Sequence, residues 1–147
     1  MPDTLRTVVY VLLGTAAYVV WWFIVLRIIW RFGWRALEQS YPLPYPVTGP
    51  RFGNCTLLVP PAGRYNRCIV ATIAREGIQI LPVGLFRPGH RPALIPWEAV
   101  QSVQRGASPA AGFTLRFPAG KHEAYLILPS QAMEEVARWT DPGDYRA

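Results

Sequence analysis

The chain has 147 residues, 51% of them hydrophobic, and its fifteen basic side chains against nine acidic ones give a net charge of +6. This composition argues against disorder, and an anchor of about 35 residues would leave enough length for one small soluble domain. The basic charge favours acidic partners, and because the sequence holds no nucleic-acid motif, we expect no nucleic-acid partner.

The first element is an apolar segment of twenty residues, Thr7 to Leu26, that carries no charge. A helix of this length is about 30 Å long, the thickness of the hydrocarbon core of a bilayer. A cleaved signal peptide has a shorter apolar stretch and a small-residue cleavage site, whereas bulky residues continue here to Leu26. The sequence therefore predicts a single transmembrane helix, within an anchor over residues 1–36.

Basic residues gather after this segment and form a predicted interface collar. On a continuing helix the arginines make one stripe, and the tryptophans lie on an adjoining strip: Arg27, Arg31 and Arg35 with Trp30 and Trp34. By the positive-inside bias the N-terminus is outside and the C-terminal domain is cytoplasmic. The collar is either an ordinary belt at the headgroups or a dedicated site for lipid or partner protein.

Two tryptophans lie inside the predicted span, although indole rings prefer membrane interfaces. Trp21 and Trp22 are placed on one side of the helix, and Gly14 with Ala17 is expected to form a smooth patch on the opposite side. Together they favour a helix that packs against a neighbouring membrane protein or its ring-shaped pigment. The alternative is that Trp21 and Trp22 are bulky side chains that face lipid and have no partner protein.

A proline-rich linker is predicted over residues 37–51, because prolines alternate with bulky residues from Tyr41 to Pro46. Six extended residues reach only about 19 Å, so the following domain must lie close to the bilayer. A proline-rich ligand for a recognition module is the alternative. The β domain is predicted over residues 52–140, followed by a tail over residues 141–147.

Seven strands are predicted from short apolar runs separated by turn residues. They cover residues 54–59, 67–74, 78–85, 93–95, 100–104, 113–117 and 123–128. A short amphipathic helix follows, with Ser130 as its N-cap and with Met133, Val136 and Trp139 on one side. The prediction is thus a mainly-β domain closed by a C-terminal helix, behind one transmembrane helix.

This order of elements resembles the bacterial pleckstrin-homology-like (GRAM-like) domains, strongly bent barrels of seven antiparallel strands plugged by a C-terminal helix. The most specific segment is Gly77 to Leu81 followed by Leu94 to Val100, where Pro96 and Trp97 form a turn that leads into the next strand. The resemblance covers residues 52–140 and implies a bacterial inner membrane. A different small barrel or sandwich is the alternative.

In the fold that the domain resembles, three loops share one rim, and here these loops are basic. The predicted basic rim comprises Arg64, Arg67, Arg87, His90, Arg91 and Lys121. The rim would face anionic headgroups or an acidic protein surface. The basic cluster that phosphoinositide-binding members carry on their first two strands is missing, so specific recognition of inositol lipids is not expected.

No catalytic or metal-binding constellation appears in the sequence, and no cofactor of its own or small-molecule substrate is expected. The histidines, serines and glutamates lack the required spacing, and Cys55 and Cys68 are expected to be buried thiols. We therefore expect a noncatalytic accessory subunit of an integral-membrane assembly, such as a photosynthetic reaction centre–antenna or respiratory complex. The alternative is a free-standing, membrane-anchored lipid-binding or sensing module.

Overall fold

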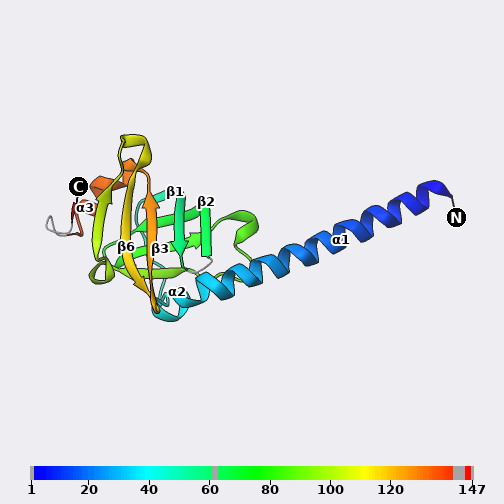
Figure 1. Ribbon diagram of the computed structural model, residues 1–147, viewed down its shortest axis with the longest axis horizontal. Coiled ribbons are helices and arrows are strands. Elements are labelled where there is room, and N and C mark those ends of the chain that lie inside the picture. The colour runs from blue at the N-terminus through cyan, green and yellow to red at the C-terminus, as the bar shows by residue number, and fades with distance from the viewer. Residues whose placement is uncertain (1, 61–62, 141–144, 147) are drawn as a thin grey trace.

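A computed structural model describes residues 2–60, 63–140 and 145–146 of the chain. A long helix projects from a small β domain, so that the N-terminus lies far from the sheet and the C-terminus lies at the opposite end of the molecule (Figure 1). The two parts are joined by direct packing of the helix end on the sheet.

The helical part consists of α1 (Asp3–Ile29), a π-helical turn η1 (Trp30–Trp34) and α2 (Arg35–Ser40). Its most apolar window of 18 residues has a mean hydropathy of 2.1, and none of that window is buried. The helix is therefore long and apolar enough to cross a membrane, and it is not a core helix of this domain. It ends at Ser40 rather than at residue 36, so the predicted linker begins later than expected.

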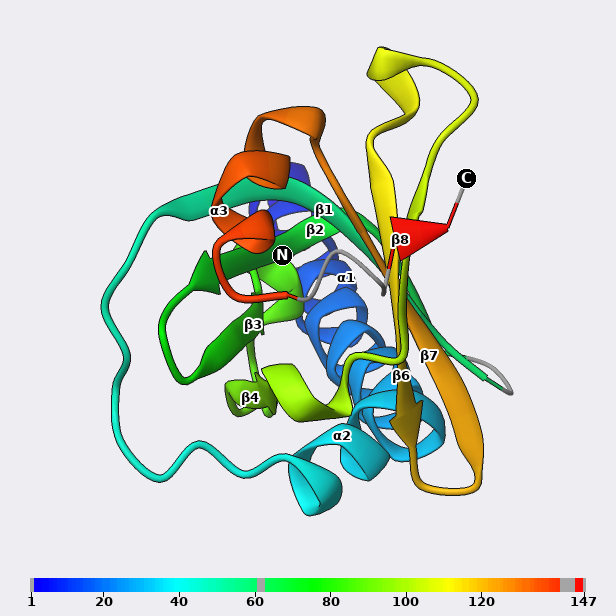
Figure 2. The same ribbon diagram turned by 90° about the vertical axis from the view of Figure 1, so that its left-hand side faces the viewer.

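All seven predicted strands are present in one antiparallel sheet that curls into a half-barrel (Figure 2). The strands are β1 (Arg51–Val59), β2 (Gly63–Ile73), β3 (Gly77–Pro82), β4 (Ala93–Pro96), β5 (Ser102–Arg105), β6 (Phe113–Ala119) and β7 (His122–Leu128). A two-residue strand, β8 (Tyr145–Arg146), adds to β5 in parallel. The order β4-β3-β2-β1-β7-β6-β5-β8 leaves β4 and β8 at the two edges.

Alternating burial along the strands shows where the core lies. In β6, Phe113, Leu115 and Phe117 are buried, whereas the residues between them are only partly covered. This is the period-2 pattern of a strand with one face on the core, as the sequence predicted. The concave side of the curled sheet therefore holds the apolar side chains of the domain.

The C-terminal helix is shorter than predicted. A 3-10 turn, η5 (Ser130–Ala132), leads into α3 (Met133–Ala137), and no side-chain hydrogen bond caps either element. The expected N-cap role of Ser130 is therefore wrong. Val136 is fully buried against the core, but Trp139 keeps 41% of its surface exposed, so the predicted apolar side is only partly covered.

The turn that carries the family resemblance has the expected geometry. Strand β4 ends at Pro96, and a 3-10 turn, η3 (Trp97–Ala99), follows before Val100 enters the core. The indole nitrogen of Trp97 donates a hydrogen bond of 2.9 Å to the carbonyl oxygen of Ala74. Trp97 thus ties the end of β4 to the end of β2 and covers the margin of the core.

Both edges of the open sheet are covered by short segments of the same chain. The amide of Leu94 in β4 donates to the carbonyl of Tyr41 at 3.1 Å, and Pro42 pairs with Ala93 in an isolated bridge. At the other edge, β8 pairs with Val103 and Gln104 of β5. The segment after the helix is therefore docked on the sheet at its start.

Two glycines allow the helix to meet the sheet at backbone distance. A Cβ atom added at Gly33 in the π turn would lie 2.8 Å from the Cα of Gly63, the first residue of β2. A Cβ atom at Gly63 would lie 2.9 Å from the Cα of Gly33. Because both neighbours are backbone, neither contact can be relieved by turning a side chain.

We predict that Gly33→Ala destabilises the junction even though alanine is the better helix former. The added methyl group should lower the free energy of unfolding by about 1–3 kcal/mol, as is typical of overpacking. Chemical denaturation of the full-length protein in detergent, followed by tryptophan fluorescence, measures this loss. Gly14→Ala is the matched control, because a Cβ atom at Gly14 meets nothing within 4 Å; equal effects of both changes would contradict the prediction.

Candidate functional site

The end of the long helix is part of the hydrophobic core of the β domain. Trp34 and Leu37 are both 0% exposed, and Trp34 packs edge-to-face on Tyr65 and His90 at ring distances of 5.4 and 5.5 Å. The expectation that Trp34 belongs to the interface collar is therefore wrong. Long-range packing and a hydrogen bond from its indole nitrogen to the carbonyl of Arg91 (2.7 Å) hold it in the core instead.

A second hydrogen bond fixes the helix to the same residue of the sheet. A carboxylate oxygen of Glu38 accepts the backbone N–H of Arg91 at 2.8 Å. Tyr41, just after the helix, donates its hydroxyl to the carbonyl of Pro118 and packs on Phe117. Polar and apolar contacts thus fix the direction of the helix relative to the sheet.

The three loops of the predicted basic rim all meet this helix. Gly63 at the start of β2 contacts Gly33, the β3–β4 segment bonds to Trp34, and Gly120 in the β6–β7 turn faces Ala36. The mouth that was expected to open toward headgroups is therefore occupied by the helix. In this arrangement the helix closes one end of the half-barrel, and α3 covers part of the other (Figure 1).

The predicted rim residues do not form one cluster. Arg87, Arg91 and Lys121 are exposed near the helix, whereas His90 is buried with 6% of its surface exposed. Arg64 and Arg67 lie within β2, not in a loop, and they line a separate hollow of about 520 Å³ on the outer side of the sheet. Strand alternation turns Arg64 outward, because the next residue, Tyr65, points into the core.

His90 is a buried neutral histidine. Its Nδ1 lies 3.1 Å from the carbonyl oxygen of Pro88, which can only accept, so Nδ1 carries the proton. The other nitrogen, Nε2, then accepts a hydrogen bond of 2.9 Å from the Tyr65 hydroxyl. Burial lowers the pKa of His90, against smaller opposing effects of the Pro88 carbonyl and of Glu38. Burial also raises the pKa of Tyr65, so this pair is uncharged at neutral pH.

The remaining collar residues form a basic pocket on the exposed side of the helix. The pocket has a volume of about 490 Å³ and is lined by Arg27, Trp30, Arg31, Arg35, Glu38 and Gln39. The guanidinium carbons of Arg27 and Arg35 lie 4.4 and 5.9 Å from the centre of the Trp30 ring. Cation–π contacts of this kind hold arginine side chains over an indole without removing their charge.

The two tryptophans of the span have different surroundings. The indole nitrogen of Trp22 donates a hydrogen bond of 3.0 Å to the carbonyl of Leu85, and its ring packs on Phe86 at 5.5 Å. Among the described residues, the ring contacts of Trp21 are with its helix neighbours Tyr18 and Trp22, and Trp21 is 54% exposed. The contact of Trp22 with the β3–β4 loop was not expected from the sequence.

The expected opposition between tryptophans and small residues is also corrected. Residues seven apart share one face of a regular α-helix, so Gly14 and Trp21 lie on the same side of α1, with Ala17 beside them. A Cβ atom added at Gly14 would meet no atom within 4 Å. Gly14, Ala17 and Trp21 on this face are all exposed in the described structure.

The two loop residues that contact Trp22, Leu85 and Phe86, belong to a 3-10 turn, η2 (Gly84–Phe86), whereas the sequence pattern predicts a strand as far as Leu85. Leu85 in this turn is 73% exposed, the highest value among the exposed large hydrophobic residues of the described chain. The sequence signal for this contact was a leucine and a phenylalanine next to each other in a segment bounded by glycine and proline. An exposed leucine is costly in water but suits an apolar environment.

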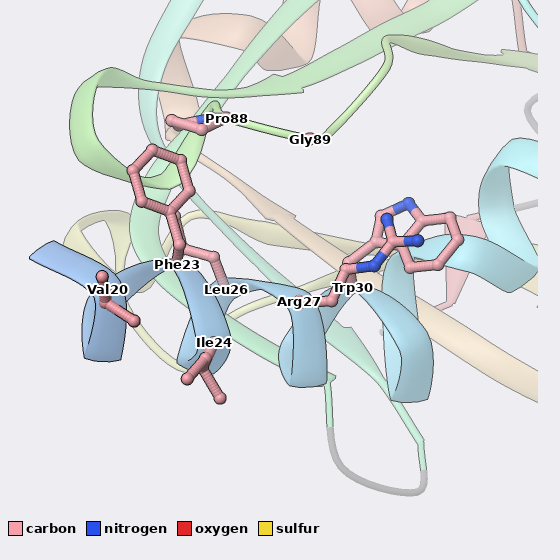
Figure 3. A pocket seen from close by; sticks show the side chains of 8 residues that line it. All are labelled: Val20, Phe23, Ile24, Leu26, Arg27, Trp30, Pro88 and Gly89. Carbon is pink, nitrogen blue, oxygen red and sulfur yellow. The ribbon is translucent and has the colours of Figure 1, made fainter.

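A groove of about 560 Å³ lies between the helix and this loop. Its walls are mostly apolar, and it is lined by Val20, Phe23, Ile24, Leu26, Arg27, Trp30, Pro88 and Gly89. Phe23 rises from the helix toward Pro88, and the guanidinium of Arg27 lies beside the indole of Trp30 (Figure 3). Arg27 and Trp30 line both this groove and the basic pocket, so the two hollows are adjacent.

Among the residues that the structure describes, no group of three or more His, Cys, Asp or Glu side chains could hold a metal ion. Cys55 and Cys68 are free and buried, and burial raises the pKa of the Cys55 thiol to about 11. The thiolate is the reactive form of cysteine, so Cys55 is a poor nucleophile at neutral pH.

The chain was also compared with known proteins. No family model and no curated protein matches it. We therefore describe the protein by its structure. A helix of membrane-spanning length has its end buried in the core of a curled, seven-stranded half-barrel.

We predict that His90 makes the folded protein less stable below neutral pH. The ordinary pKa of histidine is about 6.5, and the folded-state value is lower, so the unfolded chain binds more protons as pH falls below about 6.5. The free energy of unfolding should fall between pH 7 and pH 5 and should fall less in His90→Gln. Denaturant titrations at several pH values test this, with the exposed His122→Gln as control. Equal pH dependence in the wild type and His90→Gln would contradict the prediction.

Proposed function

We propose that this protein is a noncatalytic accessory subunit that holds a small β domain in a fixed position against a membrane, within a larger integral-membrane assembly. The observation that carries the proposal is the burial of Trp34 and Leu37 in the domain core. Because of it, the helix is not a flexible tether, and the direction of the sheet is fixed by the direction of the helix. A domain joined rigidly to its membrane helix is suited to holding a fixed position and contacting neighbouring subunits rather than to catalysis.

The β3–β4 loop supports close seating on the bilayer. Trp22 precedes Leu26, the end of the uncharged segment, by four residues, which is about 6 Å along the helix. Since Leu85 and Phe86 contact Trp22, a helix that spans from Thr7 to Leu26 would bring this turn into the margin of the hydrocarbon. The exposed Leu85 would then be covered by lipid or by an apolar partner.

The structure favours this proposal over the alternative of a free-standing module that binds headgroups through its rim. The rim is filled by Trp34 and by the helix around it, and Arg64 and Arg67 lie on a different surface. The seven-stranded order followed by a C-terminal helix supports the further proposal that the domain is pleckstrin-homology-like. In this domain the N-terminal helix would occupy the end where the basic loops meet.

The proposal places the β domain on the cytoplasmic side of a bacterial inner membrane, because Arg27, Arg31 and Arg35 follow the span. We predict that protease added to sealed right-side-out vesicles leaves the domain intact and digests it after detergent is added. Inverted vesicles provide the control, because there the domain should be digested without detergent. Digestion in right-side-out vesicles alone would place the domain on the other side.

We predict that the chain, extracted from its native membrane in mild detergent, migrates in a complex far heavier than its own 16.5 kDa. Size-exclusion chromatography with light scattering measures the mass, and mass spectrometry of the complex identifies the neighbours. A monomer after gentle extraction would contradict the proposed assembly and favour the free-standing module.

We propose that the neighbouring subunit contacts α1 at the surface with Gly14 and Trp21. A Cβ atom added at Gly14 would meet nothing within 4 Å, and the surface combines small residues with the exposed ring of Trp21. Gly14→Leu should release the chain from the complex, because the added side chain separates two closely packed backbones. Val19→Leu adds bulk on another side of α1, about 140° away, and should leave the complex intact. Equal behaviour of the two variants would exclude this face.

A further inference from the structure

We propose that one anionic phospholipid binds beside the long helix, with an acyl chain in the groove between α1 and the β3–β4 loop and its phosphate in the adjacent basic pocket. This inference deepens the proposed function and depends on membrane insertion of the helix. It names a binding site on the side of the helix, beside the β3–β4 loop, rather than inside the filled rim of the domain.

The groove supplies the apolar half of the site. Val20, Phe23 and Ile24 form its helical wall, and Pro88 and Gly89 form the opposite wall. Its volume of about 560 Å³ lies within the range of small-ligand sites, and it is open along the helix rather than enclosed. A flexible hydrocarbon chain lying along the helix fits such a groove, because its burial needs no hydrogen-bond partner.

The basic pocket supplies the polar half. Arg27 lines both hollows, and Arg31 and Arg35 continue the same exposed stripe. None of these three guanidinium groups forms an ion pair within the described part of the chain. The carboxylate that shares the pocket, Glu38, already accepts the backbone N–H of Arg91. Three arginines against one carboxylate leave the pocket with a net positive charge, which favours an anionic headgroup over a zwitterionic one.

An unused hydrogen-bond donor lies where the two hollows meet. The indole nitrogen of Trp30 is buried and has no acceptor among the described residues. A buried donor without a partner costs free energy, and an oxygen of a lipid ester or phosphate would relieve this cost once Arg27 moves from the ring to the phosphate. Trp30 borders both the groove and the pocket, at the level where a phospholipid changes from apolar to polar.

The position along the helix fits a lipid better than a second transmembrane helix. The uncharged segment ends at Leu26, and the arginines begin at the next residue, so the hollows lie on either side of the expected hydrocarbon boundary. A phospholipid crosses this boundary with the same change of polarity. A neighbouring helix would have to place acidic residues at one level to compensate the three arginines.

The test uses the full-length protein purified in detergent and native mass spectrometry. Phosphatidylglycerol and phosphatidylcholine with identical acyl chains are added in separate experiments. We expect one phosphatidylglycerol to remain bound per chain and phosphatidylcholine to bind at least about tenfold more weakly. Arg27→Gln combined with Arg31→Gln should remove this preference, and excess inorganic phosphate should not displace the lipid, because the acyl chain is held in the groove.

The matched control removes two charges elsewhere, by Arg75→Gln combined with Arg105→Gln, and should keep the preference. Equal binding of both lipids, no bound lipid, or displacement by inorganic phosphate would each overturn the inference. The outcomes separate the two proposals: a chain that migrates alone but retains phosphatidylglycerol refutes only the assembly. A heavy complex without lipid preference refutes only the lipid site.

Discussion

The structure depends on one contact, the approach of the helix backbone to the sheet at Gly33 and Gly63. Without side chains at these two positions, the π turn lies close enough to the start of β2 for Trp34 and Leu37 to enter the core. Burial of such large apolar side chains contributes several kcal/mol, and it makes the helix and the half-barrel one folding unit. The direction of the helix relative to the β domain follows from this contact.

The strands could be predicted from the sequence because their signal is local. Alternation at Phe113, Leu115 and Phe117, and the stop at Pro96, are properties of neighbouring residues and do not depend on distant ones. The helix junction could not be predicted in the same way. The position of Trp34 is decided by contacts with Tyr65 and His90, which lie far away in the sequence. Its local context, between arginines after an apolar span, is equally typical of a headgroup belt.

For the candidate site, the sequence identified the right residue types but not their grouping. Arg27, Trp30, Arg31 and Arg35 do lie together, as their spacing on a helix requires. The apolar groove beside them was missed, since its second wall, at Pro88 and Gly89, comes from a loop that only the fold brings to the helix. Gly33 was the unused signal, because a glycine inside a helix often marks close approach of another backbone.

The covered margins of the sheet have a consequence for how the molecule behaves among copies of itself. An open sheet offers unpaired backbone groups that invite strands from other molecules. Here Pro42, which has no N–H to donate, lies against Ala93 at one margin. At the other margin, Tyr145 and Arg146 take the place beside β5. Crowded on a two-dimensional surface, such chains resist joining edge to edge, which leaves helix faces and loops as the surfaces for specific neighbours.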